Sequence, residues 1–155
     1  LGFDVFEGSI LNDNVYDELD LNNIGTLLTM TSSAEINGLA LKYFDEEFGS
    51  DKIFRLSSKK EHEDENSNYP IHVLFGTRVD YLNLAQSVRQ AEEVLVQDCQ
   101  NKQDFNAICK AYRSNIIPLF VLRKEQVLVI SRDLPQFLEG DRLAFIPLHH
   151  PVRVS

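Results

Sequence analysis

The chain has 155 residues, enough for one domain or two small ones. Fifteen basic against 24 acidic residues give a formal net charge of −9, and a surface of this sign repels phosphate backbones, so we expect no nucleic-acid partner. No apolar run approaches the roughly 20 residues of a membrane helix, so we expect no direct membrane insertion of this chain. Cys99 and Cys109 lack nearby Cys or His partners, so we expect them to be reduced and to hold no metal ion.

The first third of the chain alternates strand-like and helix-like segments. Val5–Gly8 predicts a short strand that ends in a turn, and Asn12 or Asp13 can cap a helix that runs through Leu19. Thr26–Thr31 is a short, mostly apolar run, which is typical of a strand buried on both faces.

A helix and a further strand follow at the spacing of a strand–helix–strand unit. Ser32 or Ser33 can cap the helix, and Gly49 is expected to stop it. Its predicted apolar side comprises Ile36, Leu39, Ala40, Tyr43 and Phe44. Lys52–Ser57 is the next predicted strand. This order predicts a parallel sheet, and we expect an α/β, partial Rossmann-like unit over residues 1–58.

A polar stretch separates this unit from the rest of the chain. Lys59–Asn68 has no apolar residue, and we interpret residues 59–69 as a linker or solvated loop. Hairpins mixed with helices beyond it indicate a small α+β domain over residues 70–155. The predicted strands there are Ile71–Phe75, Glu93–Val96, Ile116–Leu122, Val127–Ser131 and Arg142–Leu148, and the predicted helices are Tyr81–Ala91 and Lys102–Tyr112.

No arrangement of side chains in the sequence indicates catalysis. The sequence has no Gly-rich phosphate loop, no nucleophile elbow and no zinc-protease helix motif. The acidic cluster Asp45–Glu47 is typical of a solvated helix face, and His149–His150 is expected to be an end of the chain rather than a metal site. We therefore expect no catalytic residue and no metal site.

The end of the second predicted strand is the place where a ligand could be held. Ligands of open α/β sheets bind outside the carboxyl ends of the strands, and hydroxyls and N–H groups at a helix start can hold a sugar or a phosphate. The candidates there are Thr31, Ser32 and Asn37. The alternative interpretation of this turn is ordinary helix capping by Ser32 or Ser33.

Arg55 is the fourth candidate for ligand binding. A charge within an apolar strand must reach a rim, a carboxylate or an anionic ligand. We expect both Arg55 and Asn37 to lie outside the core, so that substitution of either costs little stability, on the order of 1 kcal/mol.

Three stretches of the first unit resemble a known family. They are G-F-D-V-F-E-G-S-I (residues 2–10), L-N-N-I-G-T-L-L-T-M-T-S-S-A-E-I-N-G-L-A (21–40) and K-I-F-R-L (52–56), and they resemble the second half of a Trk-type nucleotide-binding domain, also called RCK or KTN. Thr31, Asn37 and Arg55 match the family pattern, whereas Ser9 stands where the family usually has Asp. Since the chain opens at Leu1, we expect the front half, with its Gly-rich loop and acidic ribose-binding residue, to be absent.

The second unit is similar to the tail of bacterial cation/proton antiporters of the sodium/hydrogen exchanger type. The stretches that carry this similarity are I-H-V-L-F-G, D-Y-L-N-L, N-I-I-P-L-F-V-L-R and F-L-E-G-D-R-L-A-F-I. P-L-F-V-L-R and G-D-R-L-A-F-I also resemble the small ligand-sensing domain that follows the nucleotide domain in potassium-channel regulators.

Together these resemblances imply a cytoplasmic C-terminal regulatory region of a sodium(potassium)/proton antiporter. It would be tethered to the inner membrane by its own transmembrane antiporter domain, and it would sense a ligand or assemble subunits, as a homodimer, to gate transport. The resemblance implies no enzyme and no cofactor in this chain itself, and it leaves room for NAD(H) or an adenine nucleotide in the full-length protein. The alternatives are a fragment of a nucleotide-dependent oxidoreductase and a ligand-free oligomerisation module.

Overall fold

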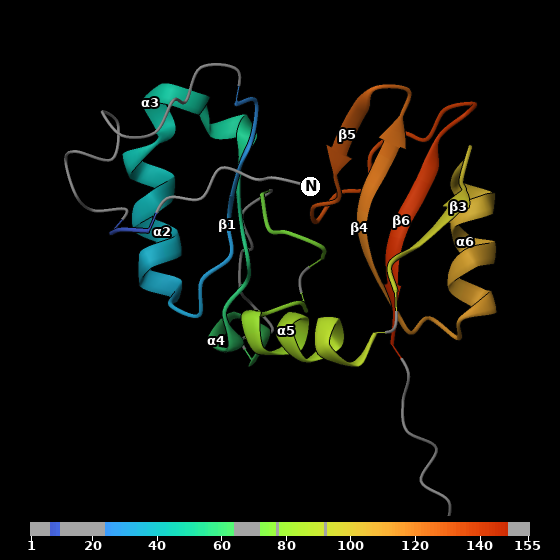
Figure 1. The fold of residues 1–155 in the computed structure, drawn as a ribbon, viewed down its shortest axis with the longest axis horizontal. Coiled ribbons are helices and arrows are strands. Elements are labelled where there is room, and N and C mark those ends of the chain that lie inside the picture. Colours follow the sequence, from blue (N-terminus) through green and yellow to red (C-terminus); the bar gives the residue numbers. More distant parts are fainter. Residues whose placement is uncertain (1–6, 10–23, 64–71, 77, 92, 149–155) are drawn as a thin grey trace, which may run out of the picture.

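The computed structural model describes residues 7–9, 24–63, 72–76, 78–91 and 93–148. Within these residues the chain has a mixed α/β fold with a two-stranded parallel sheet and a four-stranded antiparallel sheet (Figure 1). None of the helices in these ranges combines the length and the apolar character needed to cross a bilayer. The predicted helix through Leu19 and the pair His149–His150 lie outside the described residues, as do Val5 and Phe6 of the predicted strand Val5–Gly8. Its described half, Glu7 and Gly8, is not in a strand.

The two-stranded sheet and one helix form the predicted strand–helix–strand unit. Strand β1 (Leu27–Thr29) is followed by helix α2 (Ala34–Tyr43) and strand β2 (Ile53–Arg55). The two strands pair in parallel, with Leu28 opposite Phe54, which confirms the parallel pairing expected from the sequence. Leu28 is half-buried, so the expectation that this strand is buried on both faces is wrong.

Helix α2 begins directly after Ser33 and ends before the predicted stop at Gly49. Ser33 is the N-cap, because its Oγ accepts a hydrogen bond from the N–H of Ile36 at 3.2 Å. The helix stops before Phe44, and a separate short helix, α3 (Asp45–Phe48), follows. Gly49 ends this second helix with φ +77°, a conformation that glycine adopts without steric cost. A 3₁₀ turn, Ser50–Lys52, then leads into β2.

The buried face of α2 differs from the predicted apolar stripe. Asn37, Ala40 and Phe44 are buried, whereas Ile36 and Leu39 are exposed among the described residues. The reason is that the amide of Asn37 is hydrogen-bonded to the turn after β1, which turns this side of the helix toward the sheet. The core of this part consists of Ala40, Phe44, Phe48 and Ile53.

The segment after β2 departs from the predicted pattern in two places. The first residues of the predicted linker form a short helix, α4 (Lys59–Glu63), and residues 64–71 lie outside the described ranges. The predicted strand Ile71–Phe75 is wrong, because its residues form only isolated bridges. Val73 bridges Arg55 in parallel and Leu74 bridges Ser131 antiparallel, so neighbouring residues pair with different sheets and no ladder can grow.

The remaining predicted elements are confirmed. Helix α5 (Tyr81–Gln90) lies at the bottom of the view, between the two sheets (Figure 1). The elements that follow it are β3 (Leu95–Asp98), α6 (Lys102–Ala111), β4 (Ile116–Arg123), β5 (Gln126–Val129) and β6 (Arg142–Pro147). The strands pair antiparallel in the order β3-β6-β4-β5, and α6 covers the face of this sheet that is turned away from β1 and β2 (Figure 1).

One hydrophobic cluster joins the two sheets. Its buried members are Leu56, Leu74, Phe75, Val79, Ile117, Leu119 and Ile146. Leu56 directly follows β2, and Ile117 and Ile146 come from β4 and β6, so the apolar contact spans the predicted linker in sequence. The division into residues 1–58 and 70–155 stays a prediction.

Candidate functional site

The carboxyl ends of β1 and β2 open onto a cavity of about 180 Å³, which we call the strand-end cavity. Because the two strands run in parallel, their carboxyl ends lie at one edge of the sheet. The cavity is lined by Thr31, Ser32, Ala34, Asn37, Ser57, Ser58, Lys59, Asp80, Tyr81 and Leu82. Three of the four residues predicted from the sequence are therefore brought together here, namely Thr31, Ser32 and Asn37.

Asn37 holds the turn between β1 and α2. Its Oδ1 accepts hydrogen bonds from the N–H of Thr31 at 3.0 Å and from the hydroxyl of Thr31 at 2.8 Å. Its Nδ2 donates to the carbonyl of Thr31 at 3.0 Å. The side chain is only 2% exposed, so the expectation that Asn37 lies outside the core is wrong. The physical reason is that a buried amide is stable only when its donors and acceptors are satisfied, and this turn satisfies them.

Two of the polar groups that line the cavity have no hydrogen-bond or ion-pair partner within the described part of the chain. The hydroxyl of Ser32 and the ammonium group of Lys59 make no hydrogen bond or ion pair within the described part of the chain, and both residues are exposed. Capping of α2 is done by Ser33, which leaves Ser32 uncommitted. These two groups can therefore donate to a bound ligand without breaking an existing contact.

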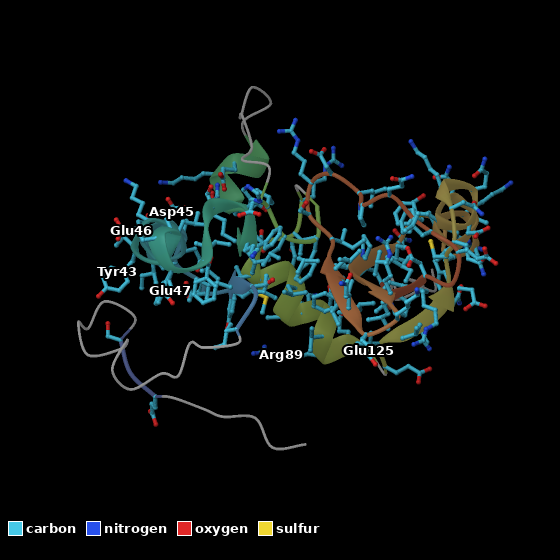
Figure 2. All side chains as sticks on the ribbon, turned by 90° about the horizontal axis from the view of Figure 1, so that it is seen from above. Tyr43, Asp45, Glu46, Glu47, Arg89 and Glu125 are labelled. Carbon is cyan, nitrogen blue, oxygen red and sulfur yellow. The ribbon has the colours of Figure 1, made fainter. Side chains whose placement is uncertain are left out.

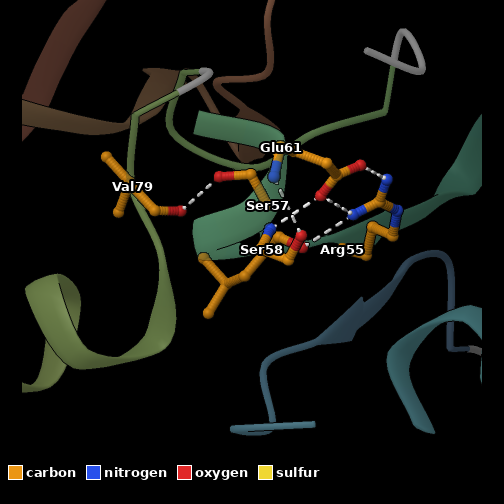
Figure 3. Close-up of polar contacts among 6 residues, drawn as sticks. Arg55, Ser57, Ser58, Glu61 and Val79 are labelled. Atoms are coloured by element: carbon orange, nitrogen blue, oxygen red, sulfur yellow. Dashed lines mark hydrogen bonds and ion pairs between the residues drawn. The ribbon is translucent and has the colours of Figure 1, made fainter. Parts of the chain in front are cut away.

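Arg55 lies apart from the other three predicted residues. Its guanidinium group forms an ion pair with Glu61 on α4, with Nη1 donating to Oε2 at 3.0 Å and Nη2 contacting Oε1 (Figure 3). The same Nη1 donates to the carbonyl of Leu56 at 3.0 Å. The side chain of Arg55 is 12% exposed and lines a different depression, together with Lys42 and His72. A carboxylate was one of the three partners that the sequence allowed for this arginine.

Glu61 anchors the start of α4 beside the cavity. Its Oε2 accepts a hydrogen bond from the N–H of Ser58 at 2.7 Å, and its own N–H donates to the hydroxyl of Ser58 at 3.3 Å (Figure 3). This reciprocal pair is a capping box. The hydrogen bond from Arg55, followed by those from Ser58, lowers the pKa of Glu61 to about 2 despite partial burial, so the carboxylate is charged at neutral pH. The box holds the next residue, Lys59, at the cavity rim.

A second contact ties β2 to the segment before α5. The hydroxyl of Ser57 donates to the carbonyl of Val79 at 3.0 Å, and both residues are buried (Figure 3). This bond fixes the two sides of the strand-end cavity relative to each other, because Ser57 lines one side and Asp80, next to Val79, lines the other. The sequence offered one missed signal for this region, the spacing Ser58-x-x-Glu61, which predicts a helix start within the stretch interpreted as a linker.

The cavity has the chemistry of a binding site for one polar group. No His or Cys lines it, and across the described residues no cluster of three or more His, Cys, Asp or Glu side chains could hold a metal ion. Its volume is below the range of roughly 300–1,000 Å³ that whole small-molecule ligands occupy. A phosphate or a sugar hydroxyl group fits the donors of Ser32 and Lys59, and these residues would hold that part of a nucleotide.

The acidic cluster on α3 takes no part in the cavity. Asp45, Glu46 and Glu47 are exposed around this short helix (Figure 2). This exposure confirms the prediction of a solvated helix face at Asp45–Glu47.

No family model, curated protein or solved structure matches this chain.

Proposed function

We propose that this chain is a cytoplasmic regulatory region of a membrane sodium(potassium)/proton antiporter, in which occupancy of the strand-end cavity is communicated to the antiparallel sheet through α5. The observation that carries the proposal is the double contact of this helix. Its first turn lines the cavity through Tyr81 and Leu82, and Leu84 packs against the cluster that contains Ile117 and Ile146 of the antiparallel sheet.

The position of the cavity supports ligand sensing. In open α/β sheets, ligands bind at the carboxyl ends of parallel strands, and in this proposal the β1–α2–β2 unit is part of a Rossmann-like nucleotide-binding domain. Ser32 and Lys59 then bind one polar group of NAD(H) or of an adenine nucleotide in the full-length protein. Arg55 keeps α4, and with it Lys59, in place through Glu61.

The proposed mechanism is a population shift. A ligand group held between Lys59 and the first turn of α5 binds more tightly to one position of this helix than to others. Binding therefore increases the population of that position, by an amount set by the difference in affinity. Because Leu84 connects α5 to the core under β4 and β6, the same shift changes the surface of the antiparallel sheet. The transmembrane antiporter domain would respond to that surface.

The experiment is ion/proton exchange by the parent antiporter in vesicles, with NADH, AMP or ATP added on the cytoplasmic side. We expect at least one of these nucleotides to change the exchange rate of the wild type, and Lys59→Gln to lose most of the change. Lys60→Gln is the matched control, because Lys60 is an exposed neighbour that does not line the cavity. Absence of any nucleotide response in the wild type, or equal responses in both variants, contradicts the proposal.

A ligand-free role in assembling subunits is the second candidate, and exposed apolar residues on α5 favour it. Leu82 is 71% exposed and Val88 is 56% exposed, and such residues are costly to leave in water when they form a patch. In this case the chain forms a homodimer through α5. Sedimentation of the chain and of its Val88→Ser variant tests it: a dimer weakened by the substitution supports assembly, and a monomer at high concentration contradicts it.

A further inference from the structure

A second and larger cavity, of about 590 Å³, lies between α5 and the adjoining ends of β4 and β6, and we call it the helix-side cavity. We propose that it binds a small organic monoanion with a planar body and a polar edge. It shares no lining residue with the strand-end cavity, so the inference does not rest on the function proposed above. Its volume falls within the range of roughly 300–1,000 Å³ that is usual for small-molecule sites.

One wall of the cavity is a polar stripe of α5. Asn83, Gln86, Ser87 and Gln90 line it, and their spacing of three, four and seven residues places them on one face of the helix. Asn83, Gln86 and Gln90 are exposed and Ser87 is half-buried, so this stripe forms the solvent-accessible wall of the cavity. It presents hydrogen-bonding groups to the space between α5 and the sheet.

Two of these four side chains, those of Gln86 and Gln90, have no hydrogen-bond partner among the described residues. Asn83 donates to the carbonyl of Arg78 at 3.4 Å, and Ser87 donates to the carbonyl of Asn83 at 2.7 Å. The amides of Gln86 and Gln90 make no hydrogen bond to any described residue, so each offers both a donor and an acceptor. Each amide can therefore pair with a donor–acceptor edge of a ligand, such as that of a ureide.

The opposite wall is apolar. It is formed by Ile116 and Ile117 at the start of β4 and by Pro147 and Leu148 at the end of β6. A flat apolar or aromatic body gains burial against such a wall while its edge faces the amides of α5.

The charge of the lining selects an anion. Arg78 is the only ionisable residue among those that line the helix-side cavity, and it forms no ion pair with a described residue. One uncompensated guanidinium in a chain of net charge −9 is a local positive site, and its planar donors match a carboxylate or a phosphate. The stoichiometry of one cation favours a monoanion.

The backbone at the cavity wall is strained. Phe75 has φ +59°, which is unusual for a bulky residue, and Gly76 beside it has φ +96°. The ring of Phe75 is buried and packs edge-on against Phe120 at a centroid distance of 5.9 Å, and its N–H donates to the carbonyl of Ile130 at 2.8 Å. Backbone conformations of this kind persist where the surroundings enforce them, and they cluster at binding sites.

The test uses three probes of similar size and different chemistry. Orotate has a carboxylate and a ureide edge, uracil has the edge without the charge, and benzoate has the charge without the edge. Amide resonances of the ¹⁵N-labelled chain are followed during titration with each probe. We expect orotate to shift the resonances of Gly76, Gln86 and Ser114, and to bind at least tenfold more tightly than uracil or benzoate.

Two arginine variants decide whether the binding is at this cavity. Arg78→Gln removes the charge from the lining and is expected to weaken orotate binding at least tenfold. Arg89→Gln is the matched control, since Arg89 is an exposed arginine of α5 that does not line the cavity (Figure 2). Absence of orotate binding at 10 mM probe, binding with shifts elsewhere on the chain, or equal weakening in both variants overturns the inference.

Discussion

Asp141 is the most deeply buried charge among the described residues, and it organises the turn before β6. Its carboxylate accepts hydrogen bonds from Arg123 Nε at 2.8 Å, from Arg123 Nη2 at 2.7 Å and from the N–H of Leu138 at 2.8 Å. Removing the carboxylate leaves Arg123 Nε and the N–H of Leu138 without an acceptor, and Arg123 keeps only the bond from Nη2 to the carbonyl of Gln136 at 2.7 Å. Asp141→Ala is therefore expected to lower the free energy of unfolding by about 3 kcal/mol, measured by urea denaturation. Glu139→Ala, next to the same turn, is the control, and an equal loss in both variants contradicts the account.

The carboxylates of Asp141 and Glu61 make the stability of the fold depend on pH. Hydrogen bonds from Arg123 lower the pKa of Asp141, and hydrogen bonds from Arg55 lower the pKa of Glu61 from 4.5 to about 2. A carboxyl group whose pKa is lowered by folding stabilises the protein above its unfolded pKa, and the contribution is lost as the pH falls toward the folded value. We expect unfolding free energy to fall between pH 4.5 and about 2, and Glu61→Gln to make that fall shallower. An unchanged slope in this variant contradicts the role of the Arg55 pair.

Asn37 and Ser32 line the same cavity and have opposite structural roles. Asn37→Ala removes the partner of both backbone groups of Thr31, so we expect a loss of about 2 kcal/mol in the free energy of unfolding. Ser32→Ala removes a hydroxyl with no partner in the described part of the chain, so its effect should stay within about 0.5 kcal/mol. Equal effects in thermal or urea unfolding would mean that the Asn37 amide does not hold the turn.

Among the elements, α4 depends on its capping box more than on its own sequence. It is only five residues long, and isolated helices of this length do not form in water. Ser58→Ala removes the hydroxyl that accepts the N–H of Glu61, which is worth about 1 kcal/mol. Trypsin should then cut after Lys59 and Lys60 about fivefold faster than in the wild type, as followed by mass spectrometry. A rate equal to that of Ser32→Ala contradicts a role for the box.

The elements also show what the sequence could and could not predict. Apolar residues recur every two residues in half-buried strands and every three to four residues in helices, and these patterns are visible without tertiary information. They predicted the two parallel strands, helices α5 and α6, and the hairpin of β4 and β5. The strand predicted at Ile71–Phe75 failed because pairing with two different sheets is a tertiary property. Helix α4 was not predicted, because the stretch that contains it has no apolar residue and was interpreted as a linker. A capping box can start a helix without any apolar residue.

For the candidate site, the sequence indicated the edge of the sheet at which the strand-end cavity lies, and it did not predict the partners of Asn37 and Arg55. Parallel strands place their carboxyl ends together, so Thr31 and Ser32 could be assigned to one cavity from spacing alone. The amide of Asn37 is hydrogen-bonded to the turn after β1, and Arg55 forms an ion pair with Glu61. Both interactions depend on how α2 and α4 pack, which local sequence patterns do not reveal. The helix-side cavity was not predicted, since its polar wall ends at Gln90 and its apolar wall begins at Ile116, 26 residues later.

At the scale of the whole molecule, the shared cluster should make the two sheets lose stability together. Leu74 is fully buried in it, and its N–H donates to the carbonyl of Arg55 at 2.8 Å. Leu74→Ala is expected to cost about 2–5 kcal/mol. Hydrogen exchange should show similar losses of protection in β2 and in β6, whereas the exposed control Leu138→Ala should show neither. A loss confined to β4 and β6 would mean that the sheets unfold separately.

The size of the strand-end cavity sets an upper limit on affinity for nucleotides in this chain by itself. A cavity of about 180 Å³ encloses one group of a nucleotide and leaves the remainder in solvent. Calorimetry with NADH, AMP or ATP should therefore give dissociation constants of about 1 mM or weaker. Micromolar binding to the chain alone contradicts this expectation.

The measurement that tests the regulatory account most directly is the nucleotide response of the parent antiporter when α5 is uncoupled from the antiparallel sheet. Leu84→Ala removes the side chain that joins α5 to the shared cluster, and Leu84 does not line the strand-end cavity. Val88→Ala makes a similar truncation at an exposed position of the same helix. The account predicts that the nucleotide-dependent change in ion/proton exchange is lost in Leu84→Ala and kept in Val88→Ala. A full response in Leu84→Ala would contradict the claim that α5 carries the signal.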